Sequence, residues 1–446
     1  MSECKLILNH ALVSGLVLAT ACAPSSSTPG RSAFERSLAP QVVPSFVEIP
    51  AWSLEQRMKQ HRVPGVSVAV FADGDILWAK AYGEADAESG RALTTATVFQ
   101  AASISKAITA FVVMRLAEQG AVDLDTPVNA LLTSWKLPQH KWTQTKPITL
   151  RHLLSHMAGL NVSDFPGYAV VQDVTGEDFA TTAQRTVFRP LKLENTFVEQ
   201  PLPARRRASA ARGHAGLESK PIDGFSHTYR ELAAGGVWST PSDLAKLALA
   251  FTDALQGKGD FLTRESAQAM IEPQFNGKGS LGAFVWSVDD GMMFGHTGGN
   301  AGFRNTYYGF VDGRGGAVIM TNSDTGFSLI WEIMASLAKV YGWSYGGAET
   351  RPAQRITSET AQAVAGKYVT QLSWIDKLTI SIELDDDGGL YVTAPPVLGR
   401  TPLYQENDRE FFLDTGARFS FQYDEAGRAS HLEAELEGGL SATRVQ

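Results

Sequence analysis

A long apolar segment that opens on small and polar residues is the feature that most constrains the fold. Residues 103–119 read SISKAITAFVVMRLAEQ, and a helix that is apolar on most of its circumference must be enclosed by other elements. Ser103 and Lys106 stand at its start, on one face, so the Lys106 amine can reach the Ser103 hydroxyl. Burial lowers the pKa of a lysine, which lets the amine take a proton from a serine. The sequence therefore predicts a buried helix that carries a nucleophilic serine and its base.

A second Ser-x-x-Lys pattern, Ser336 to Lys339, is interpreted as structural. A chain of 446 residues is expected to contain about one such pattern by chance. Ser336 lies in the middle of the apolar segment 328–340, where the helix backbone has no free donors. Ser103 instead opens its helix, where amides are free and the helix dipole is positive. Ser103 is therefore the candidate nucleophile.

Four further segments surround this pair in a definite order. Residues 63–85 predict a hairpin that turns at Asp73 and Gly74. The segments 148–160 (ITLRHLLSHMAGL), 233–251 (AAGGVWSTPSDLAKLALAF) and 295–300 (GHTGGN) follow. This order resembles the β-lactamase-like serine hydrolases, the superfamily of class C β-lactamases, DD-peptidases, D-aminopeptidases and certain carboxylesterases. The resemblance covers about residues 50–345 and is specific to the superfamily but not to one activity.

Members of this superfamily close the active site with a strand that carries Lys-Thr-Gly or His-Thr-Gly, matched here by His296, Thr297 and Gly298. By the family pattern, the amides of Ser103 and Gly299 form the oxyanion hole. Without the other motifs, a polar turn before a strand would be the simpler interpretation of this segment. A histidine is mostly neutral at pH 7, whereas a lysine carries a fixed charge that can hold a substrate carboxylate. The resemblance therefore favours an esterase or peptidase over an efficient β-lactamase.

The second motif of the family, Tyr-x-Asn, is missing. In the family its tyrosine acts with the lysine as general base, and none of the eleven tyrosines here has Asn two residues later. The segment between about residues 160 and 190 is short, which indicates an internal deletion. Tyr168 is the only tyrosine in that gap, so either it has moved into the site, or Ser103 and Lys106 work alone, or activity is lost. The loss of a proton-transfer group lowers a rate by about 10² to 10⁴.

Other kinds of site are weaker hypotheses. His152 and His156 are spaced i, i+4 on one predicted helix, which could bind zinc, but position 153 is leucine where such hydrolases carry glutamate. Capping or core hydrogen bonding is the simpler interpretation of both histidines. The sequence has no nucleotide-binding glycine loop, and its net charge of −8 argues against nucleic acid. We therefore expect a small-molecule or short-peptide substrate, no cofactor, no metal and no nucleic-acid partner.

The first thirty residues predict an export signal. Residues 6–21 are mostly apolar and precede Cys22, and residues 23–30 form a turn-rich tether. This resembles a bacterial lipoprotein signal with Cys22 as the acylated residue, and an ordinary cleaved signal peptide is the alternative. We therefore expect an exported protein, periplasmic or held at the membrane only by an N-terminal lipid, with residues 1–30 as signal and tether.

Two folded domains are expected after the tether. Residues 45–345 predict an α+β hydrolase domain of the β-lactamase/transpeptidase type, in which helices flank an antiparallel sheet. A helix is expected over residues 46–61, and another is expected to begin at Thr240 with Pro241 in its first turn. From about residue 355 the pattern changes to short alternating strands, which predict a small antiparallel β-barrel over 355–446. This part resembles the lipocalin-like domain appended to some of these hydrolases.

The resemblance implies a serine hydrolase that cleaves ester or amide bonds through an acyl-enzyme on Ser103, with Lys106 as base. The alternative is a catalytically impaired relative that binds peptides or acyl compounds in the same groove. A zinc hydrolase built on His152 and His156 is a distant third.

Overall fold

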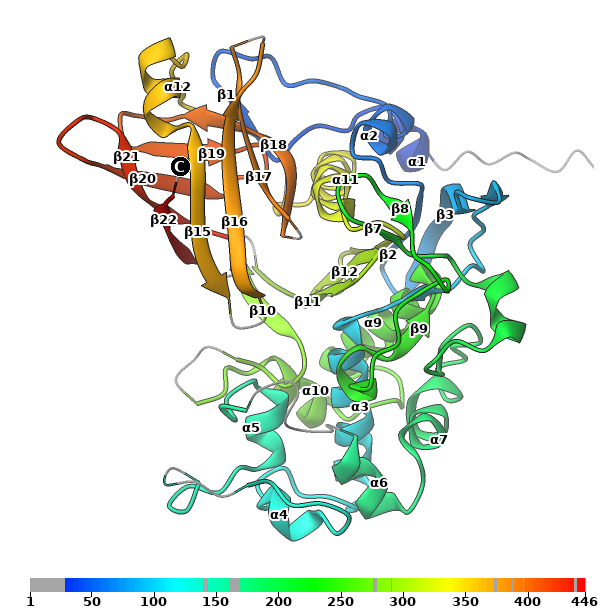
Figure 1. Ribbon diagram of the computed structural model, residues 1–446. Helices are drawn as coiled ribbons and strands as arrows, with labels where there is room; N and C mark the ends of the chain where they lie inside the picture. The colour runs from blue at the N-terminus through cyan, green and yellow to red at the C-terminus, as the bar shows by residue number, and fades with distance from the viewer. Residues whose placement is uncertain are drawn as a thin grey trace, which may run out of the picture.

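The computed structural model describes residues 29–138, 141, 143–160, 168–275, 279–289, 291–372, 375–386, 388–395, 397–436 and 439–445. The predicted signal, with Cys22, lies outside the described residues. Figure 1 shows a body of sheet and helices, coloured from blue to yellow, with an orange and red barrel beside it. This arrangement confirms the predicted α+β architecture with a C-terminal antiparallel barrel.

One antiparallel sheet of seven strands forms the centre of the body, in the order β10-β11-β12-β13-β2-β3-β4. The first and last parts of the body meet where Ile319 of β13 pairs with Val68 of β2. The predicted hairpin is confirmed, because Asp73 and Gly74 have the left-handed φ values, 52° and 86°, that a two-residue hairpin turn needs. The strands are β2 (Gly65–Ala72), β3 (Asp75–Asp86), β4 (Arg91–Ala92), β10 (Phe284–Val288), β11 (Gly291–Asn300), β12 (Phe303–Phe310) and β13 (Gly316–Thr321).

Alternate residues of β2 enter two different cores, one on each face of the sheet. Val66, Val68 and Val70 pack with α1, α2 and α11, whereas Ala69 and Phe71 pack with α3 and α9. The helix α3 is enclosed, as its apolar composition predicts, with 11 of its 15 residues buried. These helices are α1 (Pro29–Phe34), α2 (Leu54–Gln60), α3 (Ile104–Glu118), α9 (Pro241–Leu255) and α11 (Gly326–Tyr341).

Local capping chemistry sets where two of these helices begin. Thr240 accepts a hydrogen bond from the Asp243 amide at the start of α9, which confirms that predicted helix start. The helix expected over 46–61 is much shorter, since α2 begins only after Ser53, whose side chain forms a capping box with Gln56. Pro50 explains the difference, because a proline in a helix interior removes a hydrogen bond and clashes with the preceding turn.

A lobe of short helices surrounds the lower end of α3 in Figure 1. Its helices are α4 (Val128–Leu131), α5 (Leu150–Leu154), α6 (Ala169–Thr175), α7 (Phe179–Ala183), α8 (Leu232–Gly235) and α10 (Arg264–Ile271), with a π-helical turn at Gln184–Phe188 and a 3₁₀ turn at Ala204–Ser209. A small sheet, β5 (Phe99–Gln100), β9 (Val237–Ser239) and β6 (Phe197–Val198), holds the chain that leads into α3. A separate two-stranded ribbon joins β7 (His214–Ala215) and β8 (Lys220–Pro221).

The C-terminal domain is a closed eight-stranded antiparallel barrel. Its interior is filled by its own apolar side chains, including Tyr368, Leu378 and Phe421. The small antiparallel barrel that the sequence predicts is confirmed, although Gly399 and Pro402 interrupt the alternating pattern of β18. The strands are β15 (Gly366–Leu372), β16 (Ile375–Leu384), β17 (Leu390–Ala394), β18 (Leu398–Gln405), β19 (Glu410–Leu413), β20 (Arg418–Tyr423), β21 (Ala429–Ala434) and β22 (Leu440–Arg444), preceded by α12 (Ser358–Val364).

The first described residues tie the barrel to the body. The strand β1 (Val42–Pro44) pairs in parallel with β14 (Glu349–Arg351), just ahead of the barrel. The Val42 amide also donates to the carbonyl oxygen of Asp414 on the barrel, over 2.8 Å. Within the described residues, no helix combines the length and the apolar character that a membrane span requires.

Candidate active site

Ser103 and Lys106 lie where the small sheet meets α3. The Ala101 amide donates to the Val237 carbonyl oxygen over 2.8 Å, which anchors the chain just before the helix. Ala102 then adopts a left-handed φ of 51°, a strained value for a residue with a Cβ atom. Ser103 occupies the N-cap position, but its side chain makes no capping hydrogen bond. Its hydroxyl therefore stays available to another partner.

Lys106 is that partner. Its Nζ donates to Ser103 Oγ over 2.8 Å and to the Ala234 carbonyl oxygen over 3.3 Å. Burial lowers the pKa of Lys106 to about 8. An amine with this pKa is partly neutral near pH 7 to 8 and can accept a proton, which an ordinary lysine cannot do. The structure thus brings together the serine and the lysine that the sequence singles out.

Strand β11 runs directly beside the start of α3. A Cβ atom on Gly298 would lie 2.4 Å from the Ala101 carbonyl oxygen, so only glycine allows this approach. A Cβ atom on Gly299 would meet only the Arg304 side chain, at 3.7 Å. At the end of β11, Asn300 Nδ2 donates to Gln100 Oε1 over 2.8 Å, which fixes the strand to the segment before Ser103. The His-Thr-Gly segment therefore borders the serine.

His296 is buried on β11, with 6% of its surface exposed. Its Nδ1 donates to the Thr297 carbonyl oxygen over 2.5 Å, which leaves Nε2 unprotonated, and Nε2 is buried without a hydrogen-bond partner in the described part of the chain. Burial lowers the pKa of His296 to about 4, and the positive charges of Lys106 and His156 act in the same direction. His296 is therefore neutral at pH 7.

His156 lies in the same neighbourhood, a placement that its position in the sequence does not predict. The expectation that His152 and His156 share one helix is wrong, because α5 ends at Leu154 and His156 turns away with a left-handed φ of 59°. Its ring stacks on Phe284 at a centroid distance of 6.1 Å, and the Phe284 ring lies 4.9 Å from that of His296. Desolvation by the surrounding protein and the charge of Lys106 lower the pKa of His156.

His152 lies in a different environment. Its backbone and side chain complete a capping box with Thr149, and its ring stacks on Phe275 at 4.4 Å. The two histidines therefore have separate partners, and capping explains His152. Among the residues that the structure describes, no cluster of three or more His, Cys, Asp or Glu side chains could hold a metal ion.

Two other sequence candidates stand apart from the pair. Tyr168 precedes α6 and packs against the core around α3 and α9. Within the described residues, no hydrogen bond joins its hydroxyl to Ser103 or Lys106. Ser336 is buried inside α11, where its Oγ donates to the Phe34 carbonyl oxygen over 3.3 Å. That serine has the structural role that the sequence predicts.

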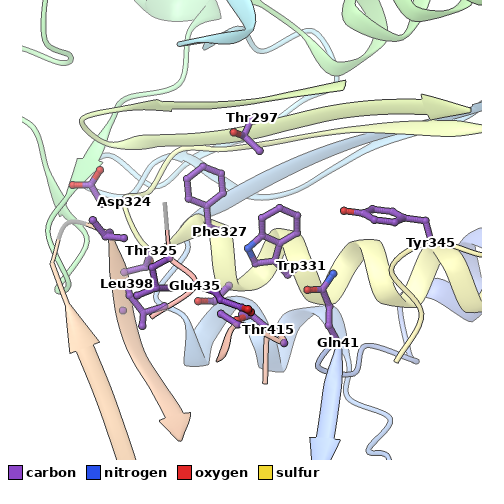
Figure 2. Close-up of a pocket in the computed structure, with 16 residues that line it drawn as sticks. Gln41, Thr297, Asp324, Thr325, Phe327, Trp331, Tyr345, Leu398, Thr415 and Glu435 are labelled. Carbon is purple, nitrogen blue, oxygen red and sulfur yellow. The ribbon is translucent and has the colours of Figure 1, made fainter. Parts of the chain in front are cut away.

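Two cavities adjoin this region. One, the α3 cavity, has a volume of about 230 Å³ and runs along α3 from Lys106. The other, the barrel-side cavity, has a volume of about 460 Å³ and lies between the body and the barrel. Figure 2 shows Thr297 on one side of it, the rings of Phe327 and Trp331 below Thr297, and Leu398 and Glu435 of the barrel region at its edge. Thr297 therefore faces a space that the barrel helps to enclose.

Comparisons with known proteins identify the family and the fold of this chain. The family profile described as Beta-lactamase matches residues 53–330. Esterase EstB of Burkholderia gladioli is 34% identical over 122 residues, which are 27% of this chain and 31% of that protein. Penicillin-binding protein 4 of Amycolatopsis lactamdurans is 26% identical over 331 residues, covering 62% of this chain and 86% of that protein. The fold is similar to the octameric penicillin-binding protein homologue from Pyrococcus abyssi, with a TM-score of 0.58, 18% identity and coverage of 87% of this chain and 99% of that chain.

Proposed function

Since the chain belongs to the Beta-lactamase family of serine hydrolases, we propose that it cleaves ester or amide bonds through an acyl-enzyme on Ser103. One observation carries the proposal: the amine of Lys106 lies 2.8 Å from Ser103 Oγ. The lowered pKa of that amine, about 8, supports a role as the base. A serine with its base in hydrogen-bond contact is the arrangement that nucleophilic catalysis requires.

The reaction proceeds in two halves. Ser103 Oγ attacks the carbonyl carbon while its proton moves to Lys106, and the amides of Ser103 and Gly299 hold the oxyanion, as the family pattern implies. The bond to the leaving group then breaks, and the Lys106 ammonium returns the proton to the departing alcohol or amine. Water repeats the sequence on the acyl-enzyme and releases the acid and the free Ser103 hydroxyl.

Lys106 performs both proton transfers in this scheme. No hydrogen bond links Tyr168 to Lys106 within the described residues, and the family's Tyr-x-Asn is missing from the sequence. Placed proton-transfer groups contribute about 10² to 10⁴ in rate, so we expect a slow enzyme. Neutral His296 supports an ester or amide substrate without a carboxylate.

A fluorophosphonate probe tests this function, because it labels only an activated serine. We expect the wild-type protein to be labelled and Ser103→Ala to be unlabelled. Ser336→Ala is the matched control, since it removes the serine of the second Ser-x-x-Lys pattern and should leave labelling intact. Labelling that persists in Ser103→Ala contradicts the assignment.

A non-catalytic binding protein is the second candidate, and the missing Tyr-x-Asn motif favours it. In that case the wild type is not labelled, although peptides or acyl compounds still raise its melting temperature. For the location of the protein in the cell, we propose that it is exported and that Cys22 carries a covalently attached lipid. Incorporation of radiolabelled palmitate that is lost in Cys22→Ser tests this location.

A further inference from the structure

The α3 cavity lies on the face of α3 that carries the catalytic pair. Lys106, Thr109 and Val113 line it at intervals of three and four residues, and Lys106 Nζ contacts Ser103 Oγ over 2.8 Å. A helix rises 1.5 Å per residue, so the distance along the axis from Ser103 to Val113 is about 15 Å. A group bonded to Ser103 can therefore extend along this face into the cavity.

The walls of the cavity are mostly apolar. Leu150, Leu153 and Leu154 line it from α5, and Val170 and Val171 line it from α6. The only ionisable side chains among its lining residues in the described part of the chain are those of Lys106, His156 and Glu231. The rest of the lining is uncharged and suits an aliphatic ligand. His156 and Gly159 are exposed, so the cavity communicates with solvent at that end.

The volume limits what the cavity can hold. Apolar cavities of about 150 Å³ accept benzene, with its six carbons. The volume of about 230 Å³ found here therefore corresponds to a chain of about eight carbons. Each methylene moved from water into such a site improves binding about fourfold.

We propose that the α3 cavity binds the aliphatic acyl chain of the substrate, so that the protein prefers esters of unbranched acids with about four to eight carbons. This inference rests on the proposed function, because the chain is delivered by the acyl group on Ser103.

A chain-length series of p-nitrophenyl esters from acetate to dodecanoate tests the proposal. We expect kcat/KM to rise about three- to fourfold per methylene up to about eight carbons and then to fall. Leu153→Trp, which fills part of the cavity, should move the optimum to shorter chains. Ala158→Leu should act in the same direction through a second wall, and Leu191→Trp, outside the cavity, should leave the optimum unchanged.

The outcomes separate this inference from the proposed function. If the acetate ester is hydrolysed and kcat/KM does not depend on chain length, the acyl-chain site is refuted. The assignment as a serine hydrolase then still stands. If no ester is cleaved and the fluorophosphonate probe does not label Ser103, the proposed function fails, and binding of 1-octanol then tests whether the cavity is an aliphatic site. A rise in melting temperature with 1-octanol in the wild type, absent in Leu153→Trp, supports an aliphatic site, and no rise in the wild type overturns it.

Discussion

Lys106 is the residue whose protonation state controls the proposed reaction. Because burial lowers its pKa to about 8, the amine gains its neutral, proton-accepting form as the pH rises through that value. We therefore expect kcat/KM for a neutral ester to increase up to about pH 8 and to level off above it. Lys106→Arg should remove at least 99% of the activity at every pH, because a guanidinium does not deprotonate. A profile that is flat between pH 6 and 9 would argue against Lys106 as the base.

His156 provides a direct test of the charges around that amine. An anion at this position should stabilise the ammonium form, so His156→Glu should move the rise in kcat/KM upward by about half to one pH unit. His152→Glu is the matched control, because the charges that act on His152 are those of Asp125, Arg151 and Lys146. Glutamate also suits its place in the capping box. Equal shifts in both variants would contradict an electrostatic contact between His156 and Lys106.

The charge of the side chain at position 296 should determine how well the site accepts substrates that carry a carboxylate. The His296 ring is buried and neutral, so it offers no fixed positive charge to a substrate. His296→Lys should therefore raise kcat/KM for carboxylate-bearing esters relative to neutral esters by about tenfold, the worth of one charged hydrogen bond. His296→Gln keeps the position neutral and should leave that ratio unchanged. An unaltered ratio in His296→Lys would place this side chain outside the substrate's reach.

At the level of elements, the approach of β11 to α3 depends on one glycine. A Cβ atom at Gly298 would sit 2.4 Å from the Ala101 carbonyl oxygen, so Gly298→Ala must push the strand away from Ser103. A displacement of about 1 Å at a reacting centre lowers activity about 10²-fold, and we expect a loss of this size with the fold retained. Gly299→Ala keeps its amide and meets Arg304 only at 3.7 Å, so it should stay within about threefold of the wild type. Equal losses of activity in Gly298→Ala and Gly299→Ala would contradict the expectation that only Gly298 is required for the approach of β11 to α3.

The elements that the sequence predicts are those with a local cause. The hairpin at Asp73 and Gly74 follows from turn chemistry, and the start of α9 follows from the Thr240 cap. The placement of His156 has no such cause, because a single left-handed residue after α5 turns its ring toward Phe284 and Lys106. An i, i+4 spacing cannot reveal where a helix stops.

Contacts between distant segments were also beyond prediction. β1 and β14 pair across some three hundred residues, and each is only three residues long, too short to show an alternating pattern. The barrel-side cavity also has no sequence signature, because it joins Thr297 to the start of β18 and the end of β21, which lie more than one hundred residues further along the chain. The motif pair itself was predictable, since Ser103 and Lys106 are neighbours on one helical face.

At the scale of the whole molecule, the barrel encloses one side of a space that reaches the active-site strand. Phe327, Trp331 and Tyr345 line the barrel-side cavity from the body, and Leu398 and Glu435 line it from the barrel region. The relative position of the two domains therefore determines the room available beside Thr297. Polar groups at the junction between the body and the barrel therefore affect the active site as well as the stability of the protein.

Asp414 is a titratable group of the barrel that faces this junction. It shares a cavity with Arg57 and His61 of the body, and burial together with the charge of Glu332 raises the pKa of Asp414 to about 7. An aspartate in the unfolded chain has a pKa near 3.9, so the folded state holds its proton more tightly and loses stability as the pH rises from about 4 to 7. Asp414→Asn should remove that loss, with a melting temperature close to the wild type's at pH 4 and several degrees higher at pH 8. The expected gain at pH 8 is on the order of a few kcal/mol.

Asp408→Asn supplies the control for this prediction, because Asp408 is an exposed barrel aspartate, so this variant should have the wild type's melting temperature at each pH. Thermal unfolding of the three proteins from pH 4 to 8, followed by circular dichroism, makes the comparison. A lower melting temperature for Asp414→Asn at pH 8 would mean that Arg57 and His61 stabilise the carboxylate more than burial and Glu332 penalise it. The junction would then be held by an ion pair, and acid rather than alkali would loosen the barrel from the body.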